Sequence, residues 1–199
     1  MLLVRNVGRS RMSTKNSKRL VIDASVLRAS GDESATYPTS KNCHQFLKNV
    51  LDICHQAVLT RDLEIEWDKH NSRFAQAWRG KMERRKKLIS IKLLKDSDLR
   101  AKIYLTDVIL TDLTDNERSD VKKDIRLIEA ALATDKIVIS LDDNTARKYF
   151  TRAAKEVKDL SELKVITWVN PDKSEENAIE WLRQGANPDV ERLLGFTES

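Results

Sequence analysis

Four acidic residues stand beside predicted strands and helices in widely separated parts of the sequence. They are Asp23, Glu66, Asp124 and Asp142. Carboxylates held close together repel one another and raise one another's pKa unless a cation lies among them. Hard oxygen ligands suit Mg²⁺ or Mn²⁺, and such ions activate a water for in-line attack on a phosphodiester. If the fold gathers these residues, metal-assisted hydrolysis is the chemistry that they indicate.

The first two acids follow two short apolar runs. Residues 19–24, RLVIDA, are typical of a buried parallel strand, and open α/β folds keep their sites at the carboxyl ends of such strands. Asp23 would then project into the site, although an aspartate here could instead cap the next helix. Residues 57–60 predict a second strand, with Thr60 or Asp62 as cap of a helix over 63–70. Glu66 lies one turn into that helix, at the same edge as Asp23, although a single acid in a charged helix is commonly solvated.

Asp124 lies on a predicted amphipathic helix. The apolar stripe that defines this helix is Val121, Ile125, Ile128 and Leu132. Asp124 and Glu129 flank the stripe at similar angles, so angle alone does not choose between them. A helix joined by a short loop to the next strand runs antiparallel to it, so a helix that starts near Val121 has its first turn beside Asp142 and Asp143. We therefore assign Asp124 to the site, although a first-turn aspartate could serve only the helix dipole.

Positive charge is concentrated in residues 72–102, where eleven basic residues face three acidic ones. The whole chain has a net charge of only +5. Interleaved apolar residues predict that this tract is helical and held against the body. Such a patch favours nucleic acid and predicts steep salt dependence, whereas a merely solvated face is the alternative. The predicted phosphate contacts are Arg84, Arg85, Lys86 and Lys87.

Composition limits the domain organisation. A chain of 199 residues can form one full domain, here residues 19–171, with a disordered basic tail at 1–18 and a helical extension at 172–199. Met12 is an alternative start of translation. No apolar run approaches the roughly 18 residues of a membrane span, so no membrane partner is expected. Cys43 and Cys54 have no metal-binding spacing and indicate free thiols in a reducing, cytoplasmic compartment.

The order of these motifs resembles that of the PIN-domain nucleases, a family that includes the toxin ribonucleases of bacterial toxin–antitoxin pairs. VIDAS, VLTRDLEIEW, KKDIRLIEAAL and VISLDD are similar to its successive acidic motifs. The hydroxyl that family members carry two residues before the last aspartate is Ser140 here, which favours Asp142 over its rival Asp143. Two features depart from the family: Leu141 replaces the usual Gly, and the basic insertion at 72–102 is longer than in compact toxins.

The resemblance implies a three-layer α/β/α PIN-like domain with a central parallel sheet, acting as a metal-dependent endonuclease with RNA favoured over DNA. Asp23, Asp124 and Asp142 would be metal ligands, Glu66 a further ligand or the group that orients water, and Asp143 a rival ligand. Ser140 would hydrogen-bond a carboxylate at the substrate-binding site. An antitoxin and a homo-oligomer are the protein partners that the resemblance suggests.

Two other functions compete with this one. A non-catalytic nucleic-acid-binding or interaction module could share the fold. A phosphatase of the haloacid dehalogenase type also begins with an aspartate at a strand end. That class requires a second acid two residues later, where this chain has Ser25, so it ranks low.

Overall fold

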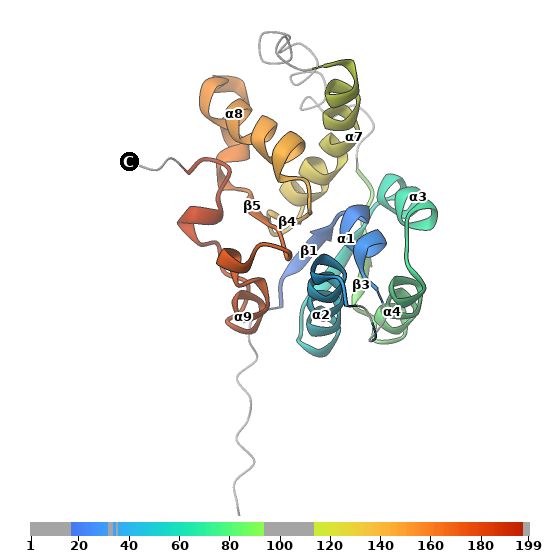
Figure 1. Ribbon diagram of the computed structural model, residues 1–199. Coiled ribbons are helices and arrows are strands. Elements are labelled where there is room, and N and C mark those ends of the chain that lie inside the picture. The colour runs from blue at the N-terminus through green and yellow to red at the C-terminus, as the bar shows by residue number, and fades with distance from the viewer. Residues whose placement is uncertain (1–16, 32–33, 35, 94–113, 197–199) are drawn as a thin grey trace, which may run out of the picture.

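The computed structural model describes residues 17–31, 34, 36–93 and 114–196 (Figure 1). The predictions for the tail at 1–16 and for the end of the basic tract at 94–102 lie outside these ranges. Within them the chain forms a mixed α/β fold around a sheet of five parallel strands.

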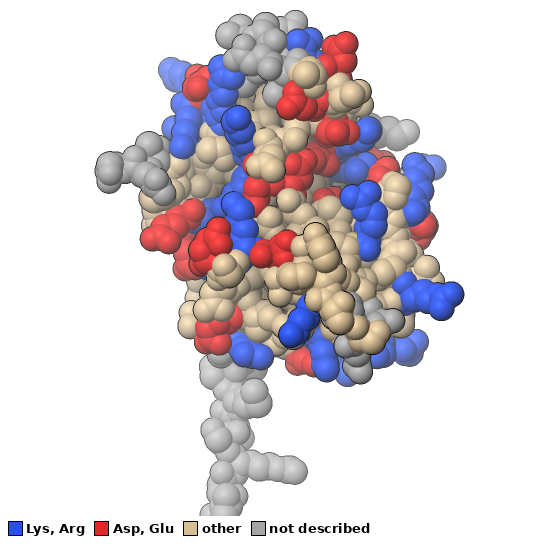
Figure 2. All heavy atoms as spheres, in the orientation of Figure 1, with Lys and Arg blue, Asp and Glu red and all other residues tan. Residues whose placement is uncertain are grey.

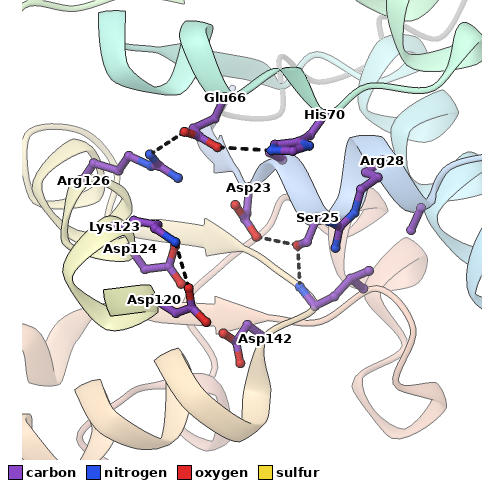
Figure 3. Close-up of a pocket in the computed structure, with 13 residues that line it drawn as sticks. Asp23, Ser25, Arg28, Glu66, His70, Asp120, Lys123, Asp124, Arg126 and Asp142 are labelled. Carbon is purple, nitrogen blue, oxygen red and sulfur yellow. Dashed lines mark hydrogen bonds and ion pairs between the residues drawn. The ribbon is translucent and has the colours of Figure 1, made fainter. Parts of the chain in front are cut away.

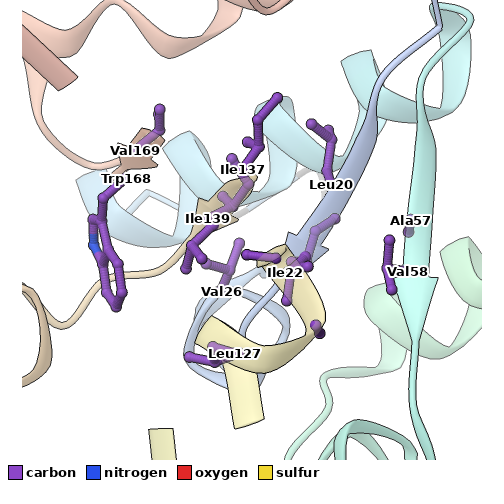
Figure 4. Packing of buried hydrophobic residues seen from close by; sticks show 14 of the residues in the cluster. Leu20, Ile22, Val26, Ala57, Val58, Leu127, Ile137, Ile139, Trp168 and Val169 are labelled. Atoms are coloured by element: carbon purple, nitrogen blue, oxygen red, sulfur yellow. The ribbon is translucent and has the colours of Figure 1, made fainter. Parts of the chain in front are cut away.

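The sheet has the order β3-β2-β1-β4-β5. Its strands are β1 (Arg19–Ile22), β2 (Gln56–Leu59), β3 (Leu88–Ser90), β4 (Ile137–Ile139) and β5 (Thr167–Val169). Val21 of the central strand is in register with Val58 on one side and Val138 on the other. The side chains of β1, β4 and β5 are almost wholly buried, as in a sheet covered on both faces (Figure 4).

Helices form two groups along the chain. The first group, between β1 and β3, is α1 (Ala24–Ala29), α2 (Pro38–Asp52), α3 (Arg61–Lys69) and α4 (Arg73–Arg84). The second, around β4, is α7 (Asp115–Leu132), the π-helix Asp143–Arg147, α8 (Lys148–Glu156) and the 3₁₀ segment Lys158–Val165. Crossovers between parallel strands are right-handed, and the chain reverses direction across the sheet after β3. The two groups therefore cover opposite faces, consistent with three α/β/α layers.

The helix that carries Asp124 begins earlier than its apolar stripe indicates. Thr114 and Glu117 form a capping box, in which the Thr114 hydroxyl accepts from Glu117 N and the Glu117 carboxylate accepts from Thr114 N. This cap starts α7 at Asp115, so the prediction that Asp124 occupies the first turn is wrong. The apolar face of α7 packs on β1 and β4, with Leu127 among the core side chains (Figure 4).

The basic tract is not wholly helical. After α4, residues 88–90 form β3, which pairs in parallel with β2 at the edge of the sheet. The prediction of a basic helical insertion is therefore wrong at these residues. Leu88 and Ile89 are partly buried and pair with Ala57 and Val58 of β2, which explains why an apolar pair interrupts the basic residues.

The segment after β5 is made of short helical pieces and not of one helix. These are the 3₁₀ turns Ser174–Glu176 and Val190–Arg192, with α9 (Ala178–Arg183) between them. Trp181 and Leu182 are buried, α9 packs on α2, and Leu193 forms a bridge to Thr167 of β5. The end of the chain is thus docked on the domain as far as it is described. Among the described helices, none combines the length and the apolarity that a bilayer crossing needs.

Candidate active site

A cleft of about 470 Å³ opens at the carboxyl ends of β1 and β4 (Figure 3). The chain proceeds from β1 to β2 on one side and returns to β4 on the other, so this is the point where the strand order reverses. Parallel α/β sheets bind their ligands at such a point. All four predicted acids line the cleft: Asp23, Glu66, Asp124 and Asp142. In Figure 2, carboxylates gather across the centre of this face, with Lys and Arg on both sides.

Asp23 is buried and held by two hydroxyls. Ser25 and Ser140 both donate to Oδ2 of Asp23, Ser140 at 3.0 Å. Asp23 stands at the N-cap of α1, but its side chain makes no capping hydrogen bond, so capping does not account for it. Ser140 is fully buried. It therefore positions a carboxylate, as expected, and offers no surface to a substrate.

Asp142 and Asp143 face different surroundings. Asp142 lines the cleft, with its Oδ1 accepting from Thr145 N at 2.9 Å and its N donating to the Ser140 hydroxyl at 3.1 Å. Asp143 points instead into a network in which Arg147 (3.0 Å), Lys173 (3.2 Å) and Asn170 (2.6 Å) contact its carboxylate. The structure places Asp142 with the other acids and Asp143 outside the cleft.

The carboxyl of Asp124 has a strongly raised pKa. Burial raises the pKa of its carboxyl to about 8, the like charges of Asp23 and Asp142 add to the rise, and Arg126 opposes it. Because this carboxyl is surrounded by others, its ionised form lacks sufficient compensation from the chain itself. A cation in the cleft would supply that compensation.

Glu66 lies at the rim of the cleft and is engaged by basic side chains. Its carboxylate oxygens lie 3.4 Å from Arg126, 3.7 Å from Lys69 and 3.8 Å from His70. The Nε of Arg126 is buried and has no hydrogen-bond partner among the described residues. Glu66 thus holds the guanidinium of Arg126 at the mouth of the cleft. This position differs from the predicted one, in which Glu66 would act together with the three aspartates.

The cleft also contains polar side chains that the sequence did not indicate. They are Ser25, Arg28, His70, Asp120, Lys123 and Arg126. Asp120 precedes Asp124 by one helical turn, so i,i+4 spacing could have found it once α7 was known to start at Asp115. Ser25 donates to Asp23, two residues before it, but its second contact leaves no local pattern, because the Leu141 N that donates to its hydroxyl comes from the loop after β4.

The basic run Arg84–Lys87 lies where the strands of the sheet start, at the end opposite to the cleft. It joins the end of α4 to the start of β3, and parallel strands all start at one edge. Arg85 donates to Leu51 O at 2.9 Å, and Lys87 donates to the same carbonyl at 2.7 Å and to that of Ile53. The structure therefore does not bring Arg84, Arg85, Lys86 and Lys87 together with the carboxylates.

The donor set fits a hard cation that keeps part of its water shell. Within the described residues, no three acidic, histidine or cysteine side chains lie close enough to enclose a bare ion. Mg²⁺ usually needs only one or two protein carboxylates and retains several waters. Asp23, Asp124 and Asp142 provide such oxygens around one open space, and their mutual repulsion favours a positive occupant.

No family model matches this chain, and no curated protein or solved structure matches it significantly.

Proposed function

We propose that this protein is a Mg²⁺- or Mn²⁺-dependent endonuclease with a PIN-like fold that hydrolyses phosphodiester bonds, with RNA as the favoured substrate. The observation that carries the proposal is the convergence of Asp23, Asp124 and Asp142 in one cleft at the reversal point of a parallel sheet. The preference for RNA comes from the motif resemblance and not from the geometry.

Each residue has a separate part in the proposed reaction. A divalent ion supplies an activated water and stabilises the leaving oxygen when it is bound. Asp23, fixed by the hydroxyls of Ser25 and Ser140, offers an oriented oxygen to that ion. Asp124, whose pKa is raised in the free protein, would give its proton to solvent and offer its carboxylate when an ion is bound. Arg126 presents its guanidinium at the cleft mouth, where it can contact the substrate phosphate.

Cleavage of labelled single-stranded RNA by the purified full chain tests the proposal. We expect cleavage in Mn²⁺ or Mg²⁺, none in EDTA, and loss of cleavage in Asp23→Asn and Asp142→Asn. The DNA oligonucleotide of the same sequence tests the substrate preference. Asp68→Asn is the matched control, because Asp68 is an exposed acid of α3 that pairs with Arg79 and does not line the cleft.

The competing function is a nucleic-acid-binding module without catalysis. It predicts tight RNA binding, no cleavage in either metal, and unchanged binding in Asp23→Asn. That combination would exclude the nuclease.

A further inference from the structure

Two further hollows lie beyond the cleft along α7. The first shares Glu66, Lys123 and Arg126 with the cleft and is also lined by Asp62, Ile65 and Lys122. The second shares Lys122 and Lys123 with the first and reaches Arg118 and Asp115 near the start of the helix. The three hollows therefore form one continuous depression, which starts between α3 and α7 and ends at the beginning of α7.

The sign of the charge changes along this depression. The cleft has five acidic and three basic side chains, whereas the first hollow beyond it has two acidic and three basic ones. The second hollow, near the start of α7, has one acidic and three basic side chains. A cation is thus favoured at one end and a polyanion beyond it, which is the charge order that a nuclease substrate with a metal at the scissile bond requires.

The basic side chains form a row because of their spacing. Arg118, Lys122 and Arg126 are four residues apart, so they lie one above another on the same face of α7, about 6 Å apart along the axis. Lys123 lies beside the row in an ion pair with Asp120 at 3.0 Å, in which both side chains are more than half exposed. An exposed pair of this kind contributes at most about 1 kcal/mol, so a phosphate can compete for the lysine.

The residues that line the hollows also indicate how a polynucleotide strand would be recognised. Among the described residues, no Phe, Tyr or Trp lines any of the three hollows. Base stacking, the usual basis of single-strand binding, has only the imidazole of His70 among these described lining residues. The available contacts are cationic, which favours recognition of the backbone with little sequence preference and strong salt dependence.

We propose that a single polynucleotide strand passes from the cleft along this row, the α7 track (Arg118, Lys122, Lys123 and Arg126), which binds its phosphates. The inference rests on the proposed function, because the cleft determines where the strand meets the metal. It assigns substrate binding to α7 and not to the basic run Arg84–Lys87, which lies at the other edge of the sheet.

Binding of a fluorescein-labelled single-stranded RNA oligonucleotide, measured by anisotropy from 50 to 200 mM salt, tests the α7 track. The measurement uses the full chain with Asp23→Asn in EDTA, so that neither metal nor cleavage enters. Neutralising two phosphate contacts with Arg118→Gln and Lys122→Gln should weaken binding about tenfold. It should also reduce the slope of log K against log salt by about 1.4, at about 0.7 per contact for a single strand.

Two charge-matched double variants complete the design. Lys155→Gln with Lys158→Gln removes two exposed charges that line none of the three hollows, and should leave the affinity and slope unchanged. Arg84→Gln with Lys86→Gln tests the basic run directly and should also have no effect. Circular dichroism of each variant establishes that it is folded.

The outcomes separate the two proposals. An unchanged slope in the Arg118/Lys122 variant, or a larger loss in the Arg84/Lys86 variant, overturns the α7 track, whether or not the wild type cleaves RNA. Loss of binding in the Arg118/Lys122 variant alone supports the track. If the wild type then cleaves nothing in Mn²⁺, the track stands as a binding surface and the nuclease is excluded.

Discussion

The two ends of β1 hold an aspartate in opposite ways. At the start of the strand, Asp135 accepts from Arg19 N at 2.7 Å and from the Arg19 guanidinium at 2.6 Å. At the other end, two hydroxyls donate to Asp23, and the like charges of Asp23 and Asp142 act on Asp124. One carboxylate is neutralised by its own chain, whereas the other belongs to a group that needs a positive charge from outside.

The pKa values of the two regions follow from this difference. Burial works to raise the pKa of Asp135, but the hydrogen bonds from Arg19 outweigh it and the pKa is lowered. For Asp124, burial and two like charges act together and raise the pKa to about 8. The charge of Asp135 is thus balanced within the fold by Arg19, whereas the acids of the cleft leave Asp124 with like charges beside it.

The largest expected effect is on catalysis by the acids at the carboxyl ends of β1 and β4. Asp23→Asn should lower the rate of RNA cleavage at least about 100-fold, because removal of a ligand or of its support costs that order of activity. The folded structure should remain, since the amide can still accept from Ser140. Gel analysis of labelled RNA in Mn²⁺ gives the rate. A rate within a factor of three of wild type would contradict the proposed role of Asp23 in cleavage.

The second prediction concerns stability and pH. Between about pH 4 and about pH 8, folded Asp124 keeps a proton that the unfolded chain has released, because an ordinary aspartate titrates near 3.9. Stability of the metal-free wild type should therefore fall as pH rises through this window and level off above it. Asp124→Asn lacks this loss, so its advantage should grow from pH 4 to pH 8.

Urea denaturation in EDTA at a series of pH values measures that difference. Addition of Mn²⁺ should stabilise the wild type increasingly as pH rises to about 8, because the ion binds the ionised carboxylate. The Asn variant should gain less. If the unfolding free energies of the two proteins change with pH in parallel, the pKa of the Asp124 carboxyl is not raised in the folded state.

A smaller effect is expected from the hydroxyls that position Asp23. Ser140→Ala removes one of the two donors to Asp23 Oδ2 and the acceptor for Asp142 N, and should lower the cleavage rate about tenfold. Mn²⁺ affinity should fall with it, while RNA affinity in EDTA stays the same. Ser140→Thr keeps the hydroxyl and should restore most of the rate. A rate loss accompanied by weaker RNA binding would indicate a general structural defect instead.

The smallest effect belongs to the other end of β1. Asp135→Asn should cost about 1 kcal/mol of unfolding free energy, since a partly exposed pair is screened by solvent. Cleavage should be unaffected, because Asp135 lies at the strand starts. Urea denaturation and the cleavage assay on the same preparation check both statements, and a tenfold loss of activity would contradict them.

Local sequence patterns were sufficient for much of the fold. RLVIDA, AVLT, KIVISL and KVITWV are short apolar runs typical of strands, and each overlaps one strand of the parallel sheet. The strand β3 was missed, because Leu88–Ser90 is short and follows a basic run that reads as a continuing helix. Its assignment depends on the pairing with β2, which is a tertiary contact and leaves no local pattern.

The candidate site shows the same division. Strand ends indicated Asp23 and Asp142, and helix direction selected Asp124 over Glu129 even though the predicted start of that helix was wrong. The placement of Arg84–Lys87 could not be foreseen, because it follows from the start of β3 at Leu88, and that strand was not predicted. Ser25 and Arg126 likewise take their roles from partners on other elements, Leu141 and Glu66.

The position of a bound metal ion tests the central claim most directly. Crystals of the full chain soaked in Mn²⁺ and measured at the manganese absorption edge would locate it without reference to activity. The account predicts an anomalous peak in the cleft, in contact with Asp23 or Asp142 and within reach of Asp124. A peak at Asp143 or at the strand starts, with none in the cleft, would contradict it.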